Sequence, residues 1–244
     1  MPATRSSFAS TKAPATAPGA SNSPTSGLDV NTATAGEPVL SDAAVDTITT
    51  TGANASAQLS NNDAEVTVFW AATDYGTDLD DWQANGSANF LGPQVTGPVG
   101  GAISGLAADT AWVARFYAVN TTPDPDVEGW SDPVSFATAL TGKSVTTLAA
   151  DPFSAYEVDL TWTDNFDTET GFIIQRSPAG AGTWTTVANV PPDTQFHIDA
   201  FTGIVPGTAY DYRVFATNAT GDSDPSNIAS ATTDAATPLA TRLL

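Results

Sequence analysis

The 244-residue sequence has no cysteine and a single histidine, His197. Without cysteine, neither disulfides nor thiolate metal sites can stabilise the fold, so hydrophobic cores must do so alone. A hydrolase triad needs a general base, most often histidine, and no glycine-rich turn surrounds a candidate serine. We therefore expect no enzyme active site and no cofactor, and we place His197 on an edge strand within residues 195–199.

Positive charge is scarce as well: 7 Lys and Arg face 27 Asp and Glu, for a net charge of -20. Such a chain is repelled by phosphate backbones and anionic membranes, so we expect no nucleic acid partner. No stretch approaches the roughly 20 apolar residues of a membrane span, and we expect no membrane insertion. The first residues carry Arg5 and Lys12 but lack the apolar run of a secretory signal, which disfavours ordinary signal-directed secretion if the sequence is complete.

Large apolar side chains are almost missing from residues 1–37, which are rich in Ala, Ser, Thr and Pro. A segment of this composition cannot bury enough surface to offset the entropy lost on ordering. We interpret it as a low-complexity N-terminal arm, either a solvated linker or a segment that orders along a partner with Phe8 and Leu28 as anchors. Residues 235–244 form a short C-terminal tail.

The sequence does contain a repeat: WVARFYAVN at 112–120 returns 98 positions later as YDYRVFATN at 210–218. Ser-Asp-Pro follows each copy, and its two occurrences lie 92 positions apart, which predicts a first-copy loop about six residues longer. A spacing near 100 residues suits two compact β-sandwiches better than a solenoid. We therefore predict similar domains at 38–139 and 144–234, joined by a short linker with limited hinge freedom.

Period-two alternation marks the strands. Val66, Val68 and Trp70 alternate with Thr67 and Phe69, and the same pattern recurs around Leu160 in the second domain. Alternation of this kind indicates strands with one face in a core. Residues 74–101 show no helical periodicity, so we expect loops and short strands there. The fold class is all-β, and the aromatic residues expected in the cores are Trp70, Trp112, Trp162 and Tyr210.

The second domain resembles a fibronectin type III module of the kind found in bacterial proteins and their viruses. The resemblance rests on LTWTDNFDTETGFIIQRS at 160–177 and VPGTAYDYRVFATNATGDSDPS at 205–226. It implies an immunoglobulin-like sandwich with Trp162 in the core and Tyr210 closing a tyrosine corner.

The first domain resembles a divergent branch of the same superfamily. The matching segments are VTVFWAATDYGT at 66–77, ISGLAADTAWVARFYAVN at 103–120 and GWSDPVSFAT at 129–138. Trp112 stands where the corner tyrosine is expected, so the hydroxyl hydrogen bond of that corner cannot form.

Acidic residues crowd several loops, and calcium takes six to eight oxygen ligands from such loops. The better candidate is the longer loop with Asp124, Asp126 and Glu128, although Pro123 and Pro125 explain its shape without an ion. The cluster of Asp164, Asp167 and Glu169 follows the ordinary turn sequence of the family. We therefore assign no metal site.

Aromatic side chains in loop-like sequence can form an interface or stack on sugar rings. Trp82 and Trp130 are our candidates for such an assembly or ligand surface, and the alternative is that they fold back to close the ends of the sandwich. Arg115 and Arg213 occupy equivalent strand positions, where we expect each to pair with a neighbouring carboxylate.

These features, with the resemblance, predict a non-enzymatic structural or interaction protein of an extracellular assembly. The most specific form of this hypothesis is a bacteriophage virion component, a head decoration or fibre protein on the virion surface, whose N-terminal arm binds other structural proteins. The alternative is a carbohydrate-binding, protein-binding or spacer module of a secreted or cell-surface bacterial protein, with surface polysaccharide as a partner. The sequence leaves a homo-oligomer open, and this sandwich hosts many unrelated roles.

Overall fold

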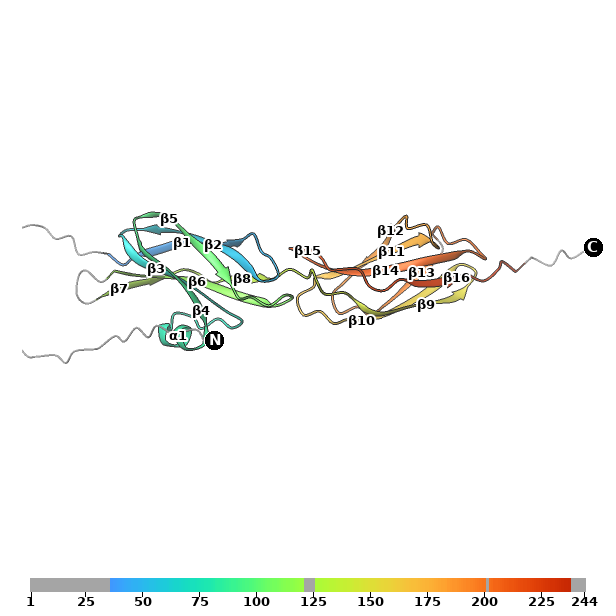
Figure 1. The fold of residues 1–244 in the computed structure, drawn as a ribbon, viewed down its shortest axis with the longest axis horizontal. Coiled ribbons are helices and arrows are strands. Elements are labelled where there is room, and N and C mark those ends of the chain that lie inside the picture. The colour runs from blue at the N-terminus through green and yellow to red at the C-terminus, as the bar shows by residue number, and fades with distance from the viewer. Residues whose placement is uncertain (1–35, 121–125, 201, 238–244) are drawn as a thin grey trace, which may run out of the picture. The chain divides into compact units, whose positions relative to one another are not determined.

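The computed structural model describes residues 36–120, 126–200 and 202–237, in which strands β1–β8 and β9–β16 form two β-sandwiches (Figure 1). The elements of the first sandwich are β1 (Val39–Asp46), β2 (Gly52–Ser60), β3 (Ala64–Ala71), α1 (Leu79–Asn85), β4 (Ser87–Gln94), β5 (Gly97–Ser104), β6 (Ala111–Asn120), β7 (Val127–Trp130) and β8 (Val134–Ala137). The elements of the second are β9 (Thr146–Ser154), β10 (Glu157–Thr163), β11 (Gly171–Pro178), β12 (Thr185–Val190), β13 (Phe196–Ala200), β14 (Ala209–Asn218), β15 (Gly221–Asp222) and β16 (Ala229–Thr232). The prediction of an all-β fold is confirmed, with one short helix added.

In the first sandwich a sheet of order β1-β2-β5 faces a sheet of order β4-β3-β6-β7, and β8 also pairs with β6. The neighbouring strands are antiparallel. Val66, Val68 and Trp70 of β3 point into the core together with Phe116 of β6, while Phe69 points to the other face of the sheet. The alternation read from the sequence therefore sets which side chains fill this core.

The second sandwich repeats this plan, with a sheet of order β13-β10-β9 against one of order β12-β11-β14-β15, and with β16 paired to β14. Leu160 and Trp162 of β10 pack in its core with Ile174 of β11 and Tyr212 of β14. The two sheets are also tied by a buried polar group, because Asp199 of β13 accepts hydrogen bonds from the Tyr212 hydroxyl at 2.9 Å and from Arg176 at 2.7 Å.

The four aromatic residues expected in the cores differ in how well their polar atoms are satisfied. Trp70, Trp162 and Tyr210 are buried, and Trp112 is partly buried against the first core. The Tyr210 hydroxyl accepts a hydrogen bond from the Val205 amide at 2.9 Å and donates to the Gly203 carbonyl at 3.2 Å, which is the tyrosine corner. The indole N–H groups of Trp112 and Trp162 are buried without a hydrogen-bond partner among the described residues. Trp112 has no hydroxyl, so the first sandwich lacks this corner.

The register of the last strands corrects the predicted loop length. Phe136 of β8 lies opposite Trp112 of β6, and Ala231 of β16 lies opposite Tyr210 of β14. The offset between the copies is therefore 98 residues in β6 and β14 but 95 residues in β8 and β16. In the hairpins themselves, Asn120 lies opposite Val127 and Asn218 lies opposite Gly221, so the first-copy loop is four residues longer, with a net difference of three by β8 and β16. The prediction of six is wrong.

The cause of this error is a misleading similarity between the two Ser-Asp-Pro segments. The Ser131 hydroxyl accepts a hydrogen bond from the Phe116 amide, and Ser226, not Ser223, makes the same bond to the equivalent residue Val214. Aligning the two Ser-Asp-Pro segments therefore shifts the copies by three residues.

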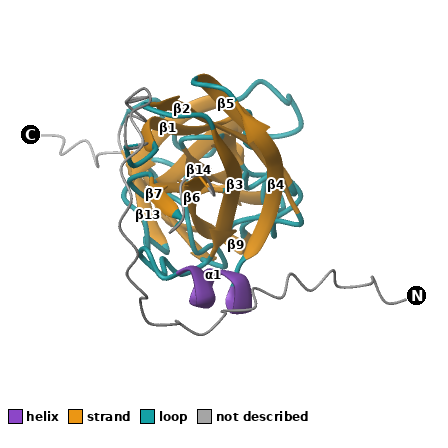
Figure 2. Ribbon diagram, turned by 90° about the vertical axis from the view of Figure 1, so that its left-hand side faces the viewer, coloured by secondary structure: helices purple, strands orange, loops and turns teal. Residues whose placement is uncertain are grey.

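Helix α1 is a correction to the expectation of loops and short strands between residues 74 and 101 (Figure 2). The Asp78 carboxylate caps it by accepting a hydrogen bond from the Asp81 amide, and its first turn is acidic, as the helix dipole favours. It ends where the Gly86 amide bonds the Trp82 carbonyl. Seven residues are too few to show a clear helical period, which is why the sequence pattern missed it. Among the described residues, no helix has the length and apolar character needed to cross a membrane.

Replacing Tyr210 with Phe should lower the free energy of unfolding of the second sandwich by about 1–2 kcal/mol, because the Val205 amide loses its acceptor. Denaturant unfolding monitored by tryptophan fluorescence measures this change. Tyr156→Phe is the control, since Tyr156 is 45% exposed and its hydroxyl should contribute less than about 0.5 kcal/mol. Equal stability of the two variants would contradict a structural role for the corner.

Candidate functional site

Asp109 lies at the junction of the two sandwiches, in the loop between β5 and β6. Its backbone has a φ of 49°, in the left-handed region that glycine, asparagine and aspartate tolerate best. The equivalent residue of the second sandwich, 98 positions later, is Gly207 with a φ of 63°. The turn therefore needs this backbone conformation in both copies, and only the first copy adds a carboxylate to it.

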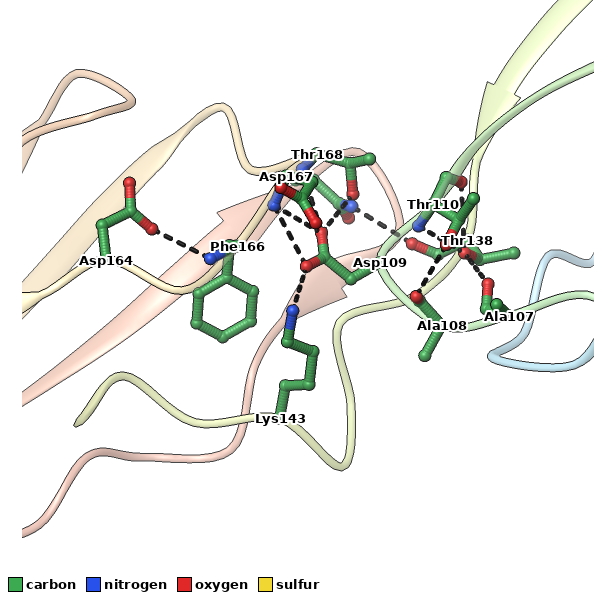
Figure 3. Close-up of polar contacts among 11 residues, drawn as sticks. Ala107, Ala108, Asp109, Thr110, Thr138, Lys143, Asp164, Phe166, Asp167 and Thr168 are labelled. Atoms are coloured by element: carbon green, nitrogen blue, oxygen red, sulfur yellow. Dashed lines mark hydrogen bonds and ion pairs between the residues drawn. The ribbon is translucent and has the colours of Figure 1, made fainter. Parts of the chain in front are cut away.

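The carboxylate of Asp109 is fully buried and accepts hydrogen bonds from the second sandwich and from the linker (Figure 3). The backbone amide of Asp167 donates at 3.1 Å, and Thr168 donates through its amide at 2.9 Å and its hydroxyl at 2.7 Å. Lys143 of the linker forms an ion pair with the same carboxylate at 2.5 Å. One side chain of the first sandwich thus holds the β10–β11 turn and the linker together.

The loop that carries Asp109 is fixed by a buried threonine. The Thr138 hydroxyl donates to the Ala107 carbonyl at 2.6 Å and accepts from the Thr110 amide at 3.0 Å, as seen beside Asp109 in Figure 3. Thr233 makes the same pair of bonds in the second sandwich, to Val205 and Thr208. This pair of hydrogen bonds, made by Thr138 in one copy and Thr233 in the other, is called the threonine latch below. It occurs in both sandwiches, and in the first it also positions the Asp109 carboxylate.

The linker between the sandwiches is packed rather than free. Leu140 is 1% exposed and belongs to the hydrophobic core of the second sandwich. The Lys143 carbonyl accepts a hydrogen bond from the Asp224 amide at 2.9 Å, and the Lys143 ammonium lies 5.0 Å from the ring centroid of Phe166. The expected limit on hinge freedom therefore has a structural basis in these contacts.

Electrostatics favour the ionised form of Asp109. Burial alone would raise the pKa of its carboxyl, but the hydrogen bonds from Lys143, Thr168 and Asp167 outweigh burial and hold the pKa below its usual value. Breaking the interactions of a buried carboxylate with a charged partner and two amide donors costs much free energy, because removing either partner leaves polar groups without hydrogen bonds.

The structure corrects the expectation that Trp82 presents its ring at a surface. Trp82 is 0% exposed, packs against Phe69 and Tyr75, and donates its indole N–H to the Gly76 carbonyl at 2.9 Å. Helix α1 folds this ring back onto the outer face of β3, which is the alternative reading of a loop aromatic.

Trp130 belongs to the same aromatic cluster and is half-buried, with its ring 4.8 Å from that of Tyr117. Part of the Trp130 side chain remains exposed to solvent, so its role in an interface stays a prediction. Phe8 and Leu28 lie outside the described residues.

The two equivalent arginines differ. The Arg115 guanidinium binds Asp74 through two hydrogen bonds of 2.8 Å, which confirms the predicted ion pair. Arg213 has no carboxylate partner among the described residues, so the prediction is wrong there. It donates to the Gln175 amide oxygen at 2.9 Å and lies over the Trp184 ring.

The acidic loops give three neighbouring carboxylates, from Asp164, Glu169 and Asp193, whose ligand atoms lie within 4.8 Å of one another. Burial raises the pKa of Glu169, which accepts a hydrogen bond from the Asp193 amide. Three such groups fall short of the six to eight oxygens of a calcium site, and we assign no metal to them. The other candidate loop includes Asp124, which lies outside the described residues.

His197 lies on β13, at the edge of its sheet, as predicted. Burial lowers the pKa of its imidazole, against the opposing effect of Asp199, so it is neutral near pH 7.

Comparison with known proteins defines the class of the second sandwich: residues 143–232 match the fibronectin type III domain family. No curated protein matches the sequence. Among solved structures, the FN1-FN3 domains of chicken CNTN1 share 16% identity over 81% of this chain and 68% of that chain, with a TM-score of 0.42. A two fibronectin type III domain segment from chicken tenascin shares 15% identity over 80% of this chain and 99% of that chain, with a TM-score of 0.39.

The second sandwich is therefore a fibronectin type III domain. Domains of this type are typically non-catalytic binding or spacer modules and are typical of extracellular or surface proteins.

Replacing Asp109 with Ala should lower the free energy of unfolding by about 3 kcal/mol, because the substitution removes the acceptor of Lys143 and of the partly buried amides of Asp167 and Thr168. Calorimetry of the full chain measures this loss. Asp151→Ala removes an exposed carboxylate on β9 and should change stability by less than about 0.5 kcal/mol. A loss from Asp109→Ala no larger than that of this control would refute the importance of the junction.

The junction should also weaken in acid. Because the pKa of Asp109 is lowered on folding, its ionised form contributes stability above the ordinary aspartate pKa of about 3.9 and loses it as the pH falls through the folded value. The stability difference between the native chain and Asp109→Asn should be constant from about pH 7 to 5 and shrink below about pH 4. A difference that stays constant or grows in acid would show that the charge contributes nothing.

Proposed function

We propose that this chain is a non-enzymatic structural protein of an extracellular assembly, in which the two sandwiches act as a braced spacer. The observation that carries the proposal is the buried Asp109 carboxylate, which joins the first sandwich to the linker and to the second sandwich. A spacer transmits position, so it needs a junction that resists bending. A pair of sandwiches that bound separate ligands independently would need no such brace.

We further infer that the first sandwich is a divergent fibronectin type III copy. The shared strand order, the 98-residue offset of β6 and β14, and the repeated threonine latch of Thr138 and Thr233 support this inference. The two copies then give a spacer built from one module type, with the junction added by a single aspartate in the first copy.

The most specific form of the proposal is a bacteriophage virion component on the particle surface, a head decoration or fibre protein. Residues 1–37 would attach the chain to other structural proteins of the particle, with Phe8 and Leu28 as anchors. The net charge of -20 supports this role, because it keeps neighbouring copies and particles apart at the surface.

A binding module of a secreted or cell-surface bacterial protein is the second candidate. The observation in its favour is a set of exposed apolar side chains on one sheet of the second sandwich, where Phe196 and Ile198 of β13 are 46% and 45% exposed. Exposed aromatic and aliphatic groups on a rigid strand suit contact with a polysaccharide or a protein.

Mass spectrometry of density-purified particles and of particle-free culture fluid from the native source tests the proposal. We expect the chain in a fixed ratio to a capsid or tail protein. Deleting residues 1–37 should then abolish incorporation and leave both sandwiches folded, because the buried residues of both cores lie after this segment. Recovery of the chain only from the soluble or cell-bound fraction would reject the virion role and favour the binding module.

A further inference from the structure

The two sandwiches present equivalent outer faces, and these faces differ in what covers them. In the first, Phe69 of β3 lies opposite Arg115 of β6. In the second, Gln175 of β11 lies opposite Arg213 of β14, and Arg213 is the residue 98 positions after Arg115. The arginine thus stands at the centre of the same sheet face in both copies.

The first face is covered by residues 74–85, the connection between β3 and β4 that contains α1. Its Asp74 binds both Nε and Nη2 of Arg115, and its Trp82 packs on Phe69 with ring centroids 6.0 Å apart. The ion pair raises the pKa of Arg115. A carboxylate and an aromatic ring, eight residues apart in one segment, therefore cover this face.

The second face has no such segment. The connection between β11 and β12 is short and supplies Trp184, whose ring lies 4.3 Å from the Arg213 guanidinium carbon, and the Phe215 ring lies 4.9 Å from the same carbon. Only the Nε of Arg213 has an acceptor among the described residues, the Gln175 amide oxygen. Burial without a carboxylate lowers the pKa of Arg213, the reverse of Arg115.

Arg213 is also exceptional among the cations of the described chain. The other three each bind a carboxylate, in the pairs Arg115–Asp74, Lys143–Asp109 and Arg176–Asp199. In a chain with 27 acidic residues and 7 basic ones, a half-buried arginine whose Nη groups lack an acceptor has an unmet preference for a carboxylate.

We propose that the face formed by Ile173, Gln175, Trp184, Arg213 and Phe215 binds an acidic segment of a partner protein that carries an aromatic side chain. The partner's carboxylate accepts hydrogen bonds from the two Nη groups of Arg213, since Gln175 already occupies Nε, and its ring packs on Phe215 and Ile173. Asp74 binds Arg115 through the other edge, Nε and Nη2.

The occupant is not the same segment of a second copy. Trp82 is fully buried and Asp74 is already bound to Arg115, so the covering segment is engaged within its own sandwich. Residues 74–85 nevertheless indicate that the second face should bind a carboxylate and an aromatic ring, because both faces have a central arginine flanked by apolar side chains. This inference does not depend on the proposed spacer function.

The test uses a synthetic peptide with the sequence of residues 73–86, TDYGTDLDDWQANG, titrated into the ¹⁵N-labelled full chain. We expect saturable NMR shifts at the Trp184 indole, the Arg213 Nε and the amides of Ile173 and Phe215. The same peptide with D74N should bind at least tenfold more weakly, because the amide cannot form a charged bidentate pair with the guanidinium.

Two protein variants separate the charge from the fold. Arg213→Lys keeps the positive charge but loses the planar guanidinium, so it should weaken binding by less than Arg213→Gln, which should lose binding at least tenfold with an otherwise unchanged NMR spectrum. Phe196→Ala removes an exposed aromatic ring from the other sheet and should bind like the native chain. Absence of shifts at 2 mM peptide, or equal affinity of Arg213→Gln and the native chain, would overturn the proposal.

Discussion

The buried carboxylate of Asp109 is the interaction on which the arrangement of this molecule depends. Each sandwich has its own hydrophobic core and its own hydrogen-bonded sheets, but the amides of Asp167 and Thr168 in the second sandwich find their acceptor in Asp109 of the first. The relation between them is set by a small number of polar groups around Asp109, together with Leu140 in the second core. Because the Asp109 carboxylate is fully buried, bending the junction would separate its charge from Lys143 and from the amides of Asp167 and Thr168 that stabilise it.

The two copies show how one plan is altered locally without changing its sheets. The left-handed turn residue is Gly207 in one copy and Asp109 in the other, and the corner residue is Tyr210 in one and Trp112 in the other. The first copy lacks the corner hydrogen bond and has the junction carboxylate, while the threonine latch of Thr138 and Thr233 is common to both copies. The most variable element is the connection after the third strand, which is a short turn in one copy and contains α1 in the other.

Much of the fold could be predicted from the sequence, because alternation in β3, β6, β10 and β14 reports directly which side chains face a core. The repeat at residues 112–120 and 210–218 marked the equivalent strands correctly. The loop length could not be read in this way, since a three-residue similarity of Ser-Asp-Pro competes with a register that only strand pairing reveals. Helix α1 was not predicted because it has only seven residues, of which Trp82 alone is buried, and these are too few to show the hydrophobic period of a helix.

The site was harder to predict than the fold. Asp109 had one signal in the sequence, an aspartate in place of the glycine of the Pro-Gly-Thr turn, but its donors are backbone amides, which no side-chain pattern reveals. Trp82 was misplaced because burial of a loop aromatic depends on how the loop folds back.

The burial of Leu140 in the core of the second sandwich has a consequence for how such modules can be exchanged. A domain that is cut at residue 144 leaves behind a side chain that its own core needs, and a longer linker would separate Leu140 from Lys143, whose spacing fits both the core and Asp109. Recombination that shuffles whole sandwiches must therefore carry these few residues with the downstream copy and Asp109 with the upstream one.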